Sequence, residues 1–170
     1  MIRGLFRRRP RLPAGMRPPL GRDERVVAWA SLPDDRVVVA TNHGLFLPGR
    51  DTRLGWHEIN KATWSGRELT VVPAAVVEER EGYAVVEDRP AWSGTLLDPG
   101  DVPDQVRTRV TRSVAYSAHH GVPGVRIVAR RVPGVDGLRW AVRYDPGVDR
   151  ADPAVVAATD ELVAAARSTV

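Results

Sequence analysis

Short apolar runs alternate with polar turn residues along residues 24–98, and this pattern predicts a series of β-strands. Each run is rich in Val or aromatic residues and is bounded by Gly, Pro or Asp. The connections are too short for crossover helices, which favours an antiparallel meander. The expected strand segments are 24–32, 35–47, 53–66, 68–79, 82–88 and 91–98.

Two interruptions within these segments predict local irregularities. Asn42, His43 and Gly44 break the apolar run of residues 35–47, which is typical of a bulge or of a tight bend between two strand halves. Pro73 lacks a backbone donor, so we expect an edge position or a kink there.

The second half of the chain predicts two helices. Asp101 is a plausible N-cap with Pro103 in the first turn, and Val106 and Val110 lie four residues apart, which indicates a helix over residues 101–112. Asp152 and Pro153 supply an N-cap and a first-turn proline for a helix over residues 152–168. Its apolar face would comprise Val155, Thr159, Leu162 and Ala166, with Val156 and Val163 beside it.

Between the two helices the pattern returns to strands. Residues 124–133 and 138–146 flank the turn Gly134–Gly137 and predict a β-hairpin, and residues 113–122 are interpreted as a further strand. The fold class expected from the whole pattern is therefore α+β. It would be an antiparallel sheet or partly open barrel with a mid-chain helix and a C-terminal capping helix.

The first half of this pattern resembles bacterial PH-like domains, including GRAM-type relatives. The resemblance rests on "ERVVAWASL", "VVVATNHGLFL", "LGWHEINKATW" and "ELTVV", within about residues 24–75. It implies a PH-like sheet, with the helix at 152–168 closing one end of the barrel, and a binding or scaffolding role without catalysis. The helix at 101–112 departs from it, because the PH pattern would continue there with strands. The chain also resembles uncharacterised proteins of GC-rich bacteria.

Charge divides the chain into two parts. Residues 1–21 contain six arginines, four prolines and no acid, whereas the rest sums to −2 within a net charge of +4. We therefore expect a basic, flexible N-terminal arm over residues 1–21 and a single PH-like domain over residues 22–170. The residues by which the arm would bind a polyanion or a partner are Arg3, Leu5, Phe6, Arg7, Arg8, Arg9, Arg11 and Arg17.

Composition excludes several classes of site. The chain has no cysteine, which excludes a disulfide framework, a thiolate nucleophile and cysteine-based metal sites. No apolar run approaches the ~20 residues of a membrane-spanning helix. The arginine run is not followed by the apolar region of a secretion signal. We expect a cytoplasmic location, and no metal and no cofactor.

Residues 53–66, "RLGWHEINKATWSG", gather the most reactive-looking side chains. On one strand these side chains would alternate between two faces and could not converge on a common point. The segment is therefore interpreted as sheet, with Trp56 and Trp64 packing and His57 and Lys61 at alternating or exposed positions. Trp29, Trp56, Trp140 and Leu162 are predicted to lie mostly buried.

Two other groups of polar residues carry weaker signals. His119 and His120 are adjacent, so on a strand their rings would point to opposite faces, and no nearby acid has ligand spacing. Asp145, Asp149 and Asp152 fit no calcium loop, and Asp152 is better used as a helix cap. The phosphate-loop, dinucleotide-binding and nucleophile-elbow motifs are absent.

Three classes of function follow from these observations. The first is a non-catalytic PH-like module that engages a protein partner. The second is an RNA- or ribosome-associated protein that uses its arginine-rich arm. An enzyme is disfavoured, because no nucleophile, base or metal site assembles. Specific phosphoinositide binding is not expected, since Asp34 and Asp35 would repel a phosphate in the loop after the first strand.

Overall fold

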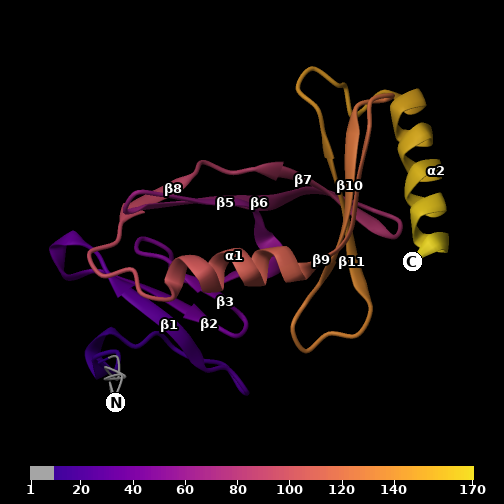
Figure 1. Cartoon of the computed structure of the whole chain (residues 1–170). Coiled ribbons are helices and arrows are strands. Elements are labelled where there is room, and N and C mark those ends of the chain that lie inside the picture. The colour runs from indigo at the N-terminus through magenta and orange to yellow at the C-terminus, as the bar shows by residue number, and fades with distance from the viewer. Residues whose placement is uncertain (1–9) are drawn as a thin grey trace, which may run out of the picture.

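A computed structural model describes residues 10–170 of the chain, which form an α+β fold with a curled sheet in the shape of a half-barrel (Figure 1). The helices are α1 (Val102–Ser113) and α2 (Pro153–Thr169). The strands are β1 (Val26–Ser31), β2 (Val37–Thr41), β3 (Gly44–Phe46), β4 (Leu54–Gly55), β5 (Ile59–Ser65), β6 (Glu68–Arg80), β7 (Tyr83–Asp88), β8 (Trp92–Thr95), β9 (Val114–His120), β10 (Val125–Arg131) and β11 (Leu138–Tyr144).

The strands form two sheets, and the larger one is mixed. β1 to β4 pair in sequence order, while the second sheet runs β5-β6-β7-β11-β10-β9, with β8 also paired to β6. All ladders are antiparallel except the one between β7 and β11. The expectation of a purely antiparallel sheet is therefore wrong. The long connection between these two strands, which includes α1, β9 and β10, allows the chain to return in the same direction.

The first hydrophobic core lies between β1–β4, the β5-β6-β8 strands and α1. Val38, Leu45, Ile59 and Leu69 are at most 1% exposed, and Val106 of α1 packs among them. It is α1, and not the C-terminal helix, that contributes to this core. The resemblance implied that the helix over residues 152–168 closes one end of a barrel formed by the first strands, and this expected place is wrong, because that helix packs elsewhere.

The second core lies between α2 and one face of the β7-β11-β10-β9 strands. Val85, Ile127, Ala129 and Val142 point to this face and meet Val163 of α2. In Figure 1 the helix lies alongside these upright strands, on the side away from α1. The side chain of Asp152 accepts a hydrogen bond from the backbone amide of Ala154 at 2.8 Å, so the expected N-cap is confirmed.

β6 joins the two cores. Its first part pairs with β5 and β8, and its last part pairs with β7. Pro73 lies where these partners change, at a place where a proline can break a ladder. The bend at Asn42–His43 between β2 and β3 is also as predicted, as is the strand assigned to residues 113–122.

The stretch 53–66 differs from its expectation as one strand. It is divided into β4, a 3-10 turn over Trp56–Glu58, and β5. A carboxylate oxygen of Glu58 accepts a hydrogen bond from the Gly55 amide at 2.7 Å, and the Trp56 indole donates to the Thr41 carbonyl at 3.1 Å. These bonds hold the turn, so Trp56 and His57 do not lie on a strand.

The predicted core is right for two of its residues. Trp56 is 2% exposed and Trp140 is 8% exposed, whereas Trp29 and Leu162 are only half-buried. Trp29 uses its indole to donate to the Pro10 carbonyl at 3.2 Å. Trp64 was expected to pack but is 37% exposed, because its end of β5 extends beyond the core.

Candidate functional site: a pocket lined by four arginines

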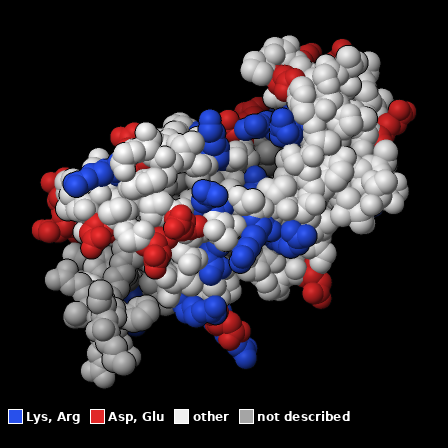
Figure 2. Space-filling view, viewed as in Figure 1, with Lys and Arg blue, Asp and Glu red and all other residues white. Residues whose placement is uncertain are grey.

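A pocket of about 210 Å³ lies between the turn Trp56–Glu58 and the face of β10 and β11 opposite to α2. Basic side chains gather around the hollow between the part of the molecule that carries α1 and the upright strands backed by α2 (Figure 2). The residues that line the pocket are His57, Glu58, Asn60, Ala74, Ala75, Val76, Ala84, Val86, Arg126, Val128, Arg130, Arg139, Ala141, Val142 and Arg143.

The four arginines come from one hairpin and form two cross-strand pairs. In the β10–β11 register Arg126 is opposite Arg143, and Arg130 is opposite Arg139. Alternation along each strand places all four on the same face, away from the α2 core. Like charges directly opposite each other weaken a sheet, so the folded chain retains an arrangement that does not favour its own stability.

Hydrogen bonds fix three of these arginines. Arg130 donates to Ser113 Oγ at 2.8 Å, Arg126 donates to Ser117 Oγ at 3.3 Å, and Arg143 forms an ion pair with Asp88 at 2.8 Å. Arg139 forms no hydrogen bond or ion pair within residues 10–170. Neither Arg130 nor Arg139 therefore forms an ion pair within the described chain, and the carboxylate that lines the pocket, Glu58, is bonded to the Gly55 amide.

Burial affects the charged side chain of Arg130 at this end of the pocket. Desolvation lowers the pKa of Arg130, and the nearby Arg143 charge lowers it further. Arg remains protonated at neutral pH even so. Arg130 is half-buried and lies near the charge of Arg143. It interacts more strongly with an anion than it would in water, because the surrounding dielectric is lower.

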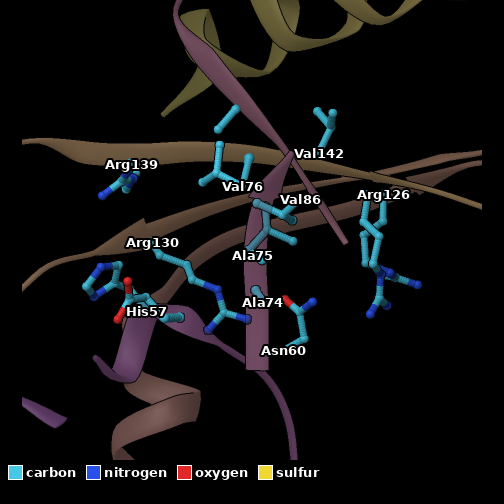
Figure 3. A pocket seen from close by; sticks show the side chains of 15 residues that line it. His57, Asn60, Ala74, Ala75, Val76, Val86, Arg126, Arg130, Arg139 and Val142 are labelled. Atoms are coloured by element: carbon cyan, nitrogen blue, oxygen red, sulfur yellow. The ribbon is translucent and has the colours of Figure 1, made fainter. Parts of the chain in front are cut away.

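His57 lies beside the Arg130–Arg139 pair. In Figure 3 its ring is on the same side of the pocket as these two arginines, while Arg126 and Asn60 lie on the other side. Burial lowers the pKa of His57; the Glu58 charge opposes this, and the charges of Arg139 and Arg130 add to the lowering. Its Nδ1 atom is buried and has no hydrogen-bond partner among the described residues. His57 is therefore a neutral imidazole at pH 7.

Small apolar residues separate the two arginine pairs. Val128 on β10 is opposite Ala141 on β11, midway between the pairs. Ala75 of β6 and Val86 of β7 line the same space, as Figure 3 shows. The pocket thus offers cations at two ends and an apolar surface between them, which suits a ligand that carries anionic groups on an apolar body.

The residues predicted for the arm do not contribute to this pocket where they are described. Arg3, Leu5, Phe6, Arg7, Arg8 and Arg9 lie outside the described residues. Arg11 and Arg17 are exposed, and Leu12 between them is buried. Asp34 and Asp35 are exposed in the turn between β1 and β2.

The polar groups singled out from the sequence do not form a metal centre. His119 is opposite Arg126 and His120 is opposite Val125, so their side chains point to opposite faces as expected. His119 Nε2 lies 2.8 Å from an Asp145 carboxylate oxygen. Residues 10–170 contain no group of three His, Asp or Glu side chains that could hold a metal ion.

Sequence reasoning identified the hairpin but missed the arginine pairs. The signal was present as Arg-x-Val-x-Arg at residues 126–130 and Arg-x-Ala-x-Arg at residues 139–143. Because a turn sets the register of a hairpin, these two motifs could have been aligned against each other. Their convergence with His57 depends on packing between residues far apart in the sequence.

Neither a family model nor a curated protein nor a solved structure matches this chain. Within the described residues, no helix has both the length and the apolar character needed to cross a membrane.

Proposed function

We propose that the protein is a non-catalytic, PH-like binding module of the cytoplasm that engages an acidic segment of a protein partner in the arginine-lined pocket. The observation that carries the proposal is the strand register, which places Arg126 opposite Arg143 and Arg130 opposite Arg139 on one face. Carboxylates placed between such pairs would relieve the repulsion and form charge-assisted hydrogen bonds.

The order of elements supports the PH-like part of the proposal. Four antiparallel strands, β1 to β4, precede β5, β6 and β8, and α1 then supplies Val102 and Val106 to the core between them. This order of elements is that of a barrel built from two sheets and followed by a packed helix. In this assignment α1 closes the end of the barrel, the role that the resemblance implied for the C-terminal helix.

The chemistry of the pocket supports binding rather than catalysis. Within the described residues its lining contains no hydroxyl, thiol or lysine amine to act as a nucleophile. Glu58 already accepts a hydrogen bond from the Gly55 amide at 2.7 Å, and the four arginines are permanent cations rather than groups that exchange protons. His57 can exchange a proton, but the described lining offers it no nucleophile to activate.

An acidic protein segment fits the pocket better than RNA does. Single-stranded RNA is usually held by large aromatic side chains on which bases stack, and the described lining contains no Phe, Tyr or Trp. Its apolar residues are small, namely Ala and Val. The alternative, an RNA- or ribosome-associated protein that uses its arginine-rich arm, remains the other outcome of the test.

The test compares two fluorescent polyanions, an oligoglutamate peptide and an oligouridylate, by anisotropy with the full-length protein. We expect the peptide to bind, and its affinity to fall as salt rises from about 50 to 500 mM. The double variant Arg130→Gln/Arg139→Gln should lose this binding. The matched variant Arg36→Gln/Arg67→Gln removes the same charge from exposed positions and should retain it.

Other results would contradict the proposal. If only the oligouridylate binds, and deletion of residues 1–21 abolishes that binding, the RNA-associated alternative is correct. If the two double variants bind oligoglutamate equally, the pocket is not where the acidic segment binds.

We also propose that the loop between β1 and β2 does not bind phosphoinositide headgroups. Asp34 and Asp35 are exposed there beside Arg36, and two carboxylates repel a phosphate. Saturable binding to phosphoinositide vesicles that survives deletion of residues 1–21 and is weakened by Arg36→Gln would contradict this.

A further inference from the structure

The spacing of the arginine pairs defines the ligand further, provided that the proposed function holds. Arg126 and Arg130 are four residues apart on β10, and Arg139 and Arg143 are four apart on β11. At a rise of about 3.3 Å per residue, the two pairs are about 13 Å apart along the strands. One pocket is lined by both pairs, so one ligand can reach both.

The surface between the pairs defines the middle of that ligand. Val128 and Ala141 lie opposite each other at the midpoint, two residues from each arginine pair. Ala75 and Val86 line the space beside them, so the middle of the pocket presents an apolar surface on which an apolar side chain can pack. Along the pocket, one arginine pair is therefore followed by an apolar surface and then by the other arginine pair. Each of these three positions is two strand residues from the next.

An extended peptide has the same rise per residue as the strands beneath it. Its residues i, i+2 and i+4 point to one side. Two acidic residues at i and i+4 would then meet the two arginine pairs, while residue i+2 would meet Val128 and Ala141. A helix needs eight or nine residues to span about 13 Å, so the same two acids would not be four apart in a helical ligand.

We infer that the pocket binds an extended segment of a protein partner in which two acidic residues, four apart, flank an apolar residue at the midpoint. The two ends of the pocket differ in how strongly they bind a carboxylate. Arg143 is already paired with Asp88, which also accepts a hydrogen bond from Asn60 at 2.6 Å. Arg139 has no such partner within residues 10–170, so the Arg130–Arg139 end binds its carboxylate more strongly.

The experiment uses two capped heptapeptides of identical composition with the full-length protein. In the first, Ser-Glu-Ser-Val-Ser-Glu-Ser, the acids flank the valine with the inferred spacing; in the second, Ser-Ser-Glu-Glu-Ser-Val-Ser, they are adjacent. Isothermal titration calorimetry should show the first binding about tenfold more tightly, which corresponds to about 1.4 kcal/mol.

Single variants then locate the two ends. Arg139→Gln and Arg126→Gln should each reduce affinity for the first peptide, and Arg139→Gln should reduce it more than Arg143→Gln does. Arg67→Gln, in the exposed turn between β5 and β6, is the control for net charge and should leave affinity unchanged.

The possible failures are distinguishable. If both peptides bind equally, the inferred spacing is wrong while the proposed function stands. If Arg67→Gln weakens binding as much as Arg139→Gln does, the acidic segment does not bind in the pocket, and the proposed function and the inference both fail. The spacing is equally wrong if oligoglutamate binds and neither heptapeptide does. If neither heptapeptide nor oligoglutamate binds, the proposed function fails, and the inference fails with it.

Discussion

Arg130 on β10 lies directly opposite Arg139 on β11, and neither side chain forms an ion pair within residues 10–170. An antiparallel pair brings opposite side chains to about 5 Å at Cβ, where like charges are unfavourable, and the charge of Arg143 also acts on Arg130. A chain selected for stability alone would place an acid at one of these positions. The repulsion is expected where a surface is kept for an anionic ligand.

Replacement of Arg139 by Thr should stabilise the fold and weaken binding. Thr favours strands and removes the repulsion from Arg130, so the free energy of unfolding should rise by about 0.2–1 kcal/mol. Urea denaturation measures this change. Arg139 is exposed and makes no hydrogen bond within the described chain, so no native hydrogen bond is lost. A fall in stability would show that Arg139 has a structural role.

The hydroxyl of Tyr144 should be important for the attachment of α2. It accepts a hydrogen bond from Arg80 Nη1 at 2.8 Å and lies 2.8 Å from Thr159 Oγ1 on α2. Tyr144→Phe should lower the free energy of unfolding by about 1–2 kcal/mol, because it removes two hydrogen bonds beside α2, one of them from a charged group. Thermal denaturation followed by circular dichroism measures the loss.

Tyr116→Phe is the matched control for that change. The Tyr116 ring packs against Trp140 with the ring centroids 5.6 Å apart, and its hydroxyl forms no hydrogen bond within residues 10–170. This variant should unfold at the temperature of the wild type. Equal losses in the two variants would mean that the bonds of Tyr144 contribute nothing specific.

Glu24 should make the fold sensitive to acid. Burial raises its pKa, but hydrogen bonds from Thr41, the Gly21 amide and Arg53 together lower the pKa below the usual 4.5. A carboxyl with a lowered pKa stabilises the fold above pH 4.5, and this stabilisation is lost as the pH falls through its folded-state pKa.

Glu24→Gln should therefore cost about 2 kcal/mol at pH 7, since bonds to a charged group are replaced by weaker ones. The difference from the wild type should shrink below pH 4.5. Glu79→Gln, at an exposed position on β6 with no hydrogen bond in the described chain, should be neutral. Denaturation at a series of pH values checks both, and a difference that persists at low pH would contradict the assignment.

His57 should affect stability in a separate pH window. Its pKa is lowered from 6.5, chiefly by burial, so the unfolded chain takes up a proton below about pH 6.5 while the folded imidazole is still neutral. The folded state consequently loses stability as the pH falls from 7 toward 5. In His57→Gln the stability should depend less on pH over this interval. An unchanged slope would show that the pKa of His57 is not lowered in the folded chain.

Much of the local structure was determined by the sequence itself. The N-cap at Asp152 forms within one turn, and the bend at Asn42–His43 and the hairpin around Gly134–Gly137 depend on a few adjacent residues. Such features follow from the conformations open to a short segment, so they can be predicted without knowledge of the rest of the chain. The strand between residues 113 and 122 follows for the same reason.

Only the tertiary structure decided where these elements meet. The spacing of apolar residues predicted an apolar face on both helices. It could not show that Val106 of α1 belongs to the first core and Val163 of α2 to the second. The turn at Trp56–Glu58 replaced an expected strand because the Trp56 indole bonds to Thr41, fifteen residues earlier. Contacts between distant residues override local preference in such places. The pocket has the same origin: the hairpin aligns four arginines, but only long-range packing brings His57 beside them.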